Sequence, residues 1–230
     1  MKREMLRTLQ SIRAGGGAAV VVSEMSGAWQ TLLDGDLNVL HGPALSEAMT
    51  GAVVAAQRTD RSQVVETDGA RMFVQLFSQP LRMIIIGAVH IAQFLAPMAV
   101  LADYQVVVVD PRRSFAADER FPGVSMHKIW PDDALQQLKP DRRTAIVTLT
   151  HDPKIDDPAL IEALKSQAFY IGSLGSRRTH AKRVERLTDA GCSAGDIARI
   201  HAPVGLNINA KSPAEIAVSA LAQVTEALRN

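Results

Sequence analysis

The sequence predicts an α/β fold in which a parallel sheet carries helices on both faces, preceded by a smaller N-terminal α/β domain. From about residue 81 onward, short aliphatic runs alternate with segments of helical periodicity, which is the pattern of βαβ units with right-handed crossovers. Aromatic residues make up only 4% of the chain. A core of Val, Ile, Leu and Ala is typical of buried parallel strands, so both observations favour the same fold class.

The first 80 residues are expected to form the smaller domain, which ends near Pro80. The chain opens on MKREMLRTLQSIRAG, whose spacing predicts an amphipathic helix, and residues 43–57 predict a second helix. Asp68-Gly69 separates two strand-like runs and is a turn signal for a hairpin. The strand-like runs of this domain are residues 17–24, 28–33, 37–40, 63–67 and 71–77.

Residues 81–230 are expected to form a Rossmann-like domain. Its predicted strands are 82–86, 105–110, 124–127, 144–150 and 168–173. Its predicted helices run from the turn after 86 to Ala102 and over 132–138, 157–166, 176–190 and 213–228. The last helix begins with Ser212-Pro213-Ala214-Glu215, a capping box with proline in the first turn. Residues 200–208 fit neither helix nor strand and are expected to be an irregular loop.

Composition and charge exclude several classes of function. The formal net charge of the 230-residue chain is +1, so we expect binding neither to nucleic acid nor to membranes. The polar N-terminal helix has no apolar stretch of signal-peptide or membrane-span length. Cys192 is the single cysteine, which excludes an intramolecular disulfide and a cysteine-cluster metal site. We therefore expect a cytoplasmic protein.

Ligands of an open parallel sheet bind beyond the carboxyl ends of its strands, so the turn after each predicted strand is a candidate site. The first turn is Gly87-Ala88-Val89-His90, whose backbone N–H groups and following helix favour a phosphate. Val89 stands where a full dinucleotide-binding fingerprint has glycine, so an ordinary tight turn is the alternative. Asp110 ends the second predicted strand, 23 residues after Gly87, near the spacing at which an acidic residue reaches a ribose hydroxyl.

Three further groups of candidates have both a functional and a structural interpretation. Arg112 and Arg113 are expected either to bind a phosphate or to pair with Asp110. The turn Thr150-His151-Asp152 can serve acid–base chemistry, metal ligation or loop hydrogen bonding alone. His201 lies in the irregular segment, where it serves either a ligand or packing. With no nucleophile and no metal-ligand spacing beside them, we expect these groups to bind a cofactor, with neither catalytic residues nor a metal site.

The fourth turn is the most informative, because it joins the loop Gly172-Ser173-Leu174-Gly175-Ser176 to Arg177, Arg178 and His180. Arginines in the first turn of a helix run against the helix macrodipole, and an external anion would explain them. The loop N–H groups and an arginine fork then form a phosphate cradle. The alternative is a solvated basic helix face that continues through Lys182, Arg183 and Arg186.

Five segments of the chain occur in a characteristic order: GAVHIA, VVVVDPRRSFAADERFP, TLTHDPKIDDPAL, YIGSLGSRRTHAKRVERL and ARIHAPVGLNINAKSPAEIAVSALA. Together they resemble the XdhC/CoxI family, accessory proteins for the maturation of xanthine dehydrogenase and related molybdenum hydroxylases. The resemblance spans roughly residues 81–221. It implies a chaperone that holds molybdenum cofactor (molybdopterin), a pterin dithiolene with a phosphate, while a cysteine desulfurase sulfurates it for a xanthine dehydrogenase-type client. We also expect a homodimer.

Applied to this chain, the resemblance implies that Arg177, Arg178 and the 172–176 loop contact the phosphate and that His151, His180 or His201 lies near the pterin. The chain departs from the family pattern in two places. Family members typically carry Gly-Ala-Gly-His where this chain has Val89 in the third position, and a cysteine-containing glycine-rich segment where it has Leu40-His41-Gly42-Pro43-Ala44. These departures are compatible with a divergent short member that works beside a full-length paralogue.

Two other functions remain open at this point. The βαβ unit and Asp110 permit an NAD(P)-dependent oxidoreductase, and a scaffold paralogue that has lost cofactor binding is the third alternative. In each case residues 87–90, 110–113, 150–152 and 172–180 are expected to meet in one cleft at the carboxyl edge of the sheet. The backbone at Val89 is expected to be extended or right-handed helical, because valine is strained at positive φ.

Overall fold

The computed structural model of the protein describes residues 2–112, 114–115 and 120–230. The chain divides into two compact units, Met1–Gln79 and Pro80–Asn230, which we call the N-terminal unit and the Rossmann unit. Each unit has its own hydrophobic clusters, one on either face of its sheet. Among the described residues, no helix combines the length and the apolar character that crossing a membrane requires.

The described part of the N-terminal unit contains a five-stranded antiparallel sheet in the order β3-β2-β1-β5-β4. Its strands are β1 (Ala19–Glu24), β2 (Gln30–Asp34), β3 (Val39–His41), β4 (Gln63–Thr67) and β5 (Ala70–Phe77). All five correspond to strand-like runs in the sequence. The unit is thus the small α/β layer that the sequence predicts.

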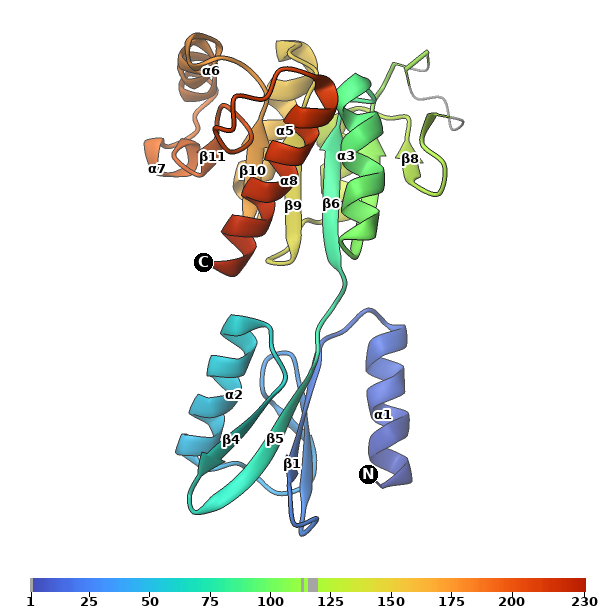
Figure 1. The fold of residues 1–230 in the computed structure, drawn as a ribbon, viewed down its shortest axis with the longest axis vertical. Coiled ribbons are helices and arrows are strands. Elements are labelled where there is room, and N and C mark those ends of the chain that lie inside the picture. The colour runs from blue at the N-terminus through green and yellow to red at the C-terminus, as the bar shows by residue number, and fades with distance from the viewer. Residues whose placement is uncertain (1, 113, 116–119) are drawn as a thin grey trace. The chain divides into compact units, whose positions relative to one another are not determined.

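Two helices cover opposite faces of this sheet (Figure 1). α1 (Arg3–Ala14) buries Met5 against one face, and α2 (Glu47–Thr59) buries Val53 against the other. The valines of β1 alternate between the two clusters, because successive side chains of a strand point to opposite faces. α2 begins later than predicted, directly after its cap Ser46, whose hydroxyl accepts a hydrogen bond from the backbone N–H of Met49.

The described part of the Rossmann unit contains a six-stranded sheet in the order β8-β7-β6-β9-β10-β11, and every neighbouring pair is parallel. The strands are β6 (Leu81–Ile86), β7 (Tyr104–Val109), β8 (Ser125–His127), β9 (Thr144–Thr148), β10 (Tyr170–Ser173) and β11 (Ile200–His201). Counted in chain order this is 3-2-1-4-5-6, the doubly wound arrangement with its switch point between β6 and β9.

Helices cover both faces of the Rossmann sheet, as the sequence predicts (Figure 1). On one face, α3 and α8 pack against each other and over side chains such as Ile85; on the other, α4, α5 and α6 pack over side chains such as Ile84. The bounds are α3 (His90–Leu101), α4 (Pro131–Leu138), α5 (Pro153–Lys165), α6 (Arg177–Asp189) and α8 (Pro213–Arg229). The predicted capping box of α8 is present, with Ser212 and Glu215 each accepting the other's backbone N–H.

The structure corrects the sequence prediction in three further places, all in the Rossmann unit. α5 begins at Pro153 instead of 157, because the Asp152 side chain caps it and Pro153 occupies the first turn. A short helix, α7 (Ala194–Ile197), was not predicted. The irregular loop predicted for 200–208 begins instead with strand β11, which pairs with β10 through only two residues and is too short to show a period in sequence.

Candidate functional site

The first and third turns pack directly against each other at the switch point. Gly87, which follows β6, has a φ of +107°, and a Cβ atom placed there would lie 2.5 Å from Cγ2 of Thr150. The backbone N–H of Gly87 donates to the carbonyl of Val109. Val89 has a φ of −88° and an extended backbone, as predicted, so it caps α3 without strain. His90 is exposed, and its ring contacts Phe94.

Asp110 is buried, and its carboxylate is fully engaged within the protein. Its oxygens accept hydrogen bonds from the backbone N–H groups of Ala88 (2.8 Å) and Arg112 (2.9 Å) and from the Arg112 guanidinium. Burial alone would raise the pKa of Asp110, but these hydrogen bonds and the charge of Arg112 outweigh it and hold the pKa below its ordinary value. Arg112 therefore makes the pairing that the sequence left open, whereas Arg113 lies outside the described residues.

The third turn is organised by a carboxylate that sequence reasoning missed. Asp156, on the first turns of α5, accepts hydrogen bonds from the hydroxyl of Thr150 (2.6 Å) and the backbone N–H of His151 (3.0 Å). Only 1% of Asp156 is exposed, and burial raises its pKa. The side chain of His151 is exposed, and its backbone has a φ of +61°. Thr150 therefore holds the loop through its bond to Asp156, and Asp152 caps the start of α5.

In the fourth turn, Gly172 and Ser173 are buried in the core, whereas the exposed Arg177 and Arg178 line cavities. Gly172 leaves no room for a side chain beside Tyr170, and the Ser173 hydroxyl is hydrogen-bonded to that of Thr148. Gly175 has a φ of +139°, and Ser176 caps α6 by accepting the backbone N–H of Thr179. Arg177 and Arg178, both exposed in the first turn of α6, line two different cavities.

The cavity that Arg178 lines lies between α5 and α6 and measures about 260 Å³. We call it the α5–α6 cavity. Its charged lining is mainly basic, because Arg178, Lys182, Arg183 and Arg186 face two carboxylates. The full lining is His151, Pro153, Asp156, Asp157, Arg178, Thr179, Lys182, Arg183 and Arg186.

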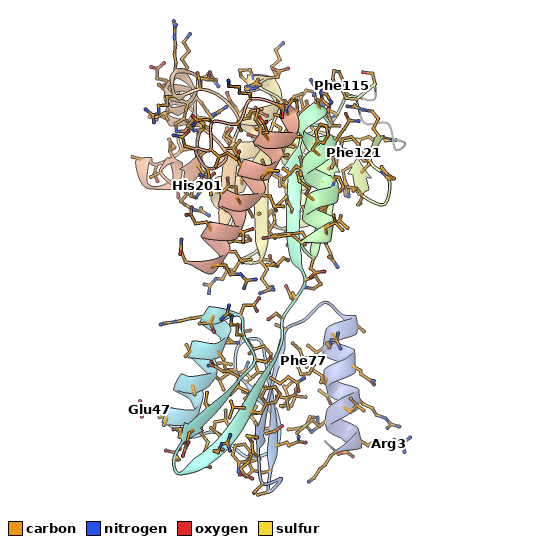
Figure 2. All side chains as sticks on the ribbon, viewed as in Figure 1. Arg3, Glu47, Phe77, Phe115, Phe121 and His201 are labelled. Carbon is orange, nitrogen blue, oxygen red and sulfur yellow. The ribbon has the colours of Figure 1, made fainter. Side chains whose placement is uncertain are left out.

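The cavity that Arg177 lines is larger, about 420 Å³, and lies between the start of α6, the segment 203–210 and α8. We call it the α6–α8 cavity. His201, labelled in Figure 2, lies in β11 and stacks on Tyr170 with ring centroids 4.7 Å apart, so it makes the packing contact that the sequence allowed. Nδ1 of His180 is buried and has no hydrogen-bond partner among the described residues.

The four turns therefore lie along one edge of the sheet, but they do not form the single cleft that the sequence predicts, because no one cavity is lined by all four. Their linings include His151, Arg177 and Arg178, whereas residues 87–90 and 110–112 line neither. Arg183 and Asp156 are the functional candidates that sequence reasoning missed. A signal existed for Arg183, because it lies four residues before Leu187 on the buried face of α6.

Comparisons with known proteins agree with the Rossmann-like fold. Residues 83–224 match the family model of the XdhC Rossmann domain. The chain is 31% identical over 163 residues to the uncharacterized protein YqeB of Escherichia coli. This match covers 69% of this chain and 29% of YqeB. It is 38% identical over 96 residues to the molybdenum cofactor insertion chaperone PaoD of Escherichia coli, covering 42% of this chain and 30% of PaoD.

A third relative, named as a probable xanthine dehydrogenase subunit of Bacillus subtilis, is 30% identical over 156 residues, covering 67% of this chain and 45% of that protein. The chain thus spans less than half the length of these curated relatives. A crystal structure described as a xanthine dehydrogenase from Bacillus halodurans shares the fold, with a TM-score of 0.71 over 99% of this chain and 64% of that one, at 24% identity. The XdhC Rossmann model covers more than half of the residues of this chain, and the chain therefore belongs to the XdhC/CoxI family.

Proposed function

We propose that this protein holds molybdenum cofactor for sulfuration by a cysteine desulfurase and for insertion into a xanthine dehydrogenase-type molybdenum hydroxylase. The observation that carries the proposal is the basic α5–α6 cavity at the carboxyl edge of an XdhC Rossmann domain. A relative with 38% identity over part of this chain is named a molybdenum cofactor insertion chaperone, which supports the same role. A homodimer, and a full-length relative working beside it, are further parts of the proposal.

The side chains around the cavities fit the phosphate of the cofactor. Arg177 and Arg178 diverge from the first turn of α6, and guanidinium groups bind phosphate oxygens through paired N–H donors. The same residues offer no thiolate, because Cys192 lies in the turn after α6 and packs against the core, where burial raises the pKa of its thiol. When bound, the cofactor supplies the redox chemistry of the client enzyme; the residues of this chain bind and orient its phosphate.

Analysis of the purified protein for pterin, molybdenum and nucleotide tests the proposal. Co-purified molybdopterin is expected. Bound NAD(P) without pterin would instead support the oxidoreductase alternative, although the Asp110 carboxylate already accepts bonds from Ala88 and Arg112 and is not free for a ribose. A protein that binds neither would be the scaffold paralogue.

Charge reversal at Arg178 is expected to weaken binding of the cofactor. Arg178→Glu replaces an attraction with a repulsion at the rim of the cavity, and because the side chain is exposed we expect a modest loss of roughly tenfold, about 1.4 kcal/mol. Calorimetric titration with molybdopterin measures the change. Arg142→Glu, at an exposed position that lines neither cavity, is the matched control. Equal affinities for the two variants would contradict a role for Arg178.

A further inference from the structure

Arg183 is a buried cation whose donors are only partly used. It is 2% exposed, and its Nη2 donates to the carbonyl of Leu174 at 2.8 Å. Its Nε and Nη1 are buried and have no hydrogen-bond partner among the described residues. Buried donors that lack an acceptor destabilise the folded chain. The Nε and Nη1 donors of Arg183 therefore need an acceptor from outside the chain.

Two partly buried arginines of this unit show how the fold satisfies an arginine of structural role. Arg199 donates to the carbonyls of Leu164, Ser166 and Ala168. Arg112 makes a two-point contact with a carboxylate. Arg183 differs from both, because it lines the α5–α6 cavity and directs its side chain to a single carbonyl.

The two carboxylates of the cavity do not complete the bonding of Arg183. Asp156 uses one oxygen for the Thr150 hydroxyl and the other for the His151 N–H, and burial raises its pKa. Asp157 forms a two-point ion pair with Arg186. Asp156 and Asp157 offset part of the charge of Arg183, but the four cations of the cavity outnumber these two carboxylates, so the cavity keeps a net positive charge.

We infer that the α5–α6 cavity binds the phosphate group of a phosphomonoester, with Nε and Nη1 of Arg183 as its buried donors and Arg178 and Lys182 as its exposed cations. The Nε and Nη1 edge of a guanidinium matches two phosphate oxygens, which makes arginine the usual residue for planar recognition of phosphate. Bound phosphate supplies both missing acceptors at once. The inference rests on the proposed function only for the identity of the molecule that carries the phosphate.

The test uses the full chain and two probes, inorganic phosphate and AMP, titrated by calorimetry. Arg183→Met keeps an apolar stem at this position but removes all donors, and it is expected to weaken binding of both probes at least tenfold. Arg142→Met, at an exposed position that lines neither cavity, is the matched control and is expected to change affinity less than threefold. AMP that binds more tightly than phosphate indicates a phosphomonoester ligand; equal binding indicates free phosphate at the same site.

A measurement on the unsubstituted protein covers the case in which Arg183→Met does not fold. The Nε–H resonance of Arg183, observed by ¹H–¹⁵N NMR, is expected to shift downfield on addition of phosphate, because it gains an acceptor. A resonance that does not move, or full phosphate affinity in folded Arg183→Met, would overturn the inference. Phosphate binding that depends on Arg183, in a protein that does not bind molybdopterin, would leave this inference standing and remove the proposed function.

Discussion

Replacing Gly87 by alanine is expected to destabilise the Rossmann unit by about 3 kcal/mol. Two costs add: the φ of +107° is strained for any residue with a side chain, and the new methyl group would lie 2.5 Å from Cγ2 of Thr150. The contact joins the turns after β6 and β9, the switch point at which the strand order reverses. Thermal and chemical unfolding of the full chain measure the loss.

Two further variants separate the costs. Thr150→Ser removes Cγ2 but keeps the hydroxyl that donates to Asp156, so in the Gly87→Ala background it is expected to restore about 1–2 kcal/mol. Gly191→Ala, at a φ of +89° with nothing within 4 Å of its new methyl group, is the control for backbone strain alone. Additive effects of Gly87→Ala and Thr150→Ser would show that the two turns are not in contact.

Replacing Asp110 by asparagine is expected to cost about 3 kcal/mol of stability, because it breaks an ion pair whose carboxylate is fully buried and leaves Arg112, 31% exposed, without its partner. An amide also offers one acceptor oxygen where the carboxylate accepts from both Ala88 and Arg112. Urea unfolding at neutral pH measures the difference. Asp141→Asn is the comparison: that carboxylate bonds Thr144 and pairs with Arg82, but its side chain is 42% exposed, and we expect a loss of about 1 kcal/mol.

The same residue contributes to the pH dependence of stability. The pKa of Asp110 is lower in the folded protein than in the unfolded chain, so its stabilisation is fully present above the unfolded value and is lost as the pH falls through the folded value. The stability of the unsubstituted protein is therefore expected to decrease in acid, below about pH 4. In Asp110→Asn this part of the acid dependence disappears. An identical acid dependence in the two proteins would contradict the assignment.

The elements of the fold were largely predictable because their causes are local. The aliphatic runs of β6 and β7 and the capping box at Ser212 each leave a pattern within a few residues of sequence. β11 was not predictable, since a strand of two residues is defined by its partner β10 and has no period of its own.

The sequence predicts which edge of the sheet holds the candidate site, but it does not predict which residues line the cavity. The rule for open parallel sheets places the turns after β6, β7, β9 and β10 at one edge, and they lie there. Which of them surround a cavity depends on how α5 meets α6, a contact between segments that sequence patterns treat separately. Arg183 illustrates the difficulty: its charge predicts exposure, whereas its place on the face of Leu187 buries it.

The strand registers also determine when each unit can form as the chain leaves the ribosome. In the N-terminal unit, β1 pairs with β5 through Ala19 and Phe77, so its sheet is complete once that segment has emerged. In the Rossmann unit, the central strand β6 pairs on one side with β9, where Arg82 lies opposite Thr144. That edge of β6 stays unpaired until β9 has been synthesised. The N-terminal unit can therefore fold before the Rossmann sheet is complete.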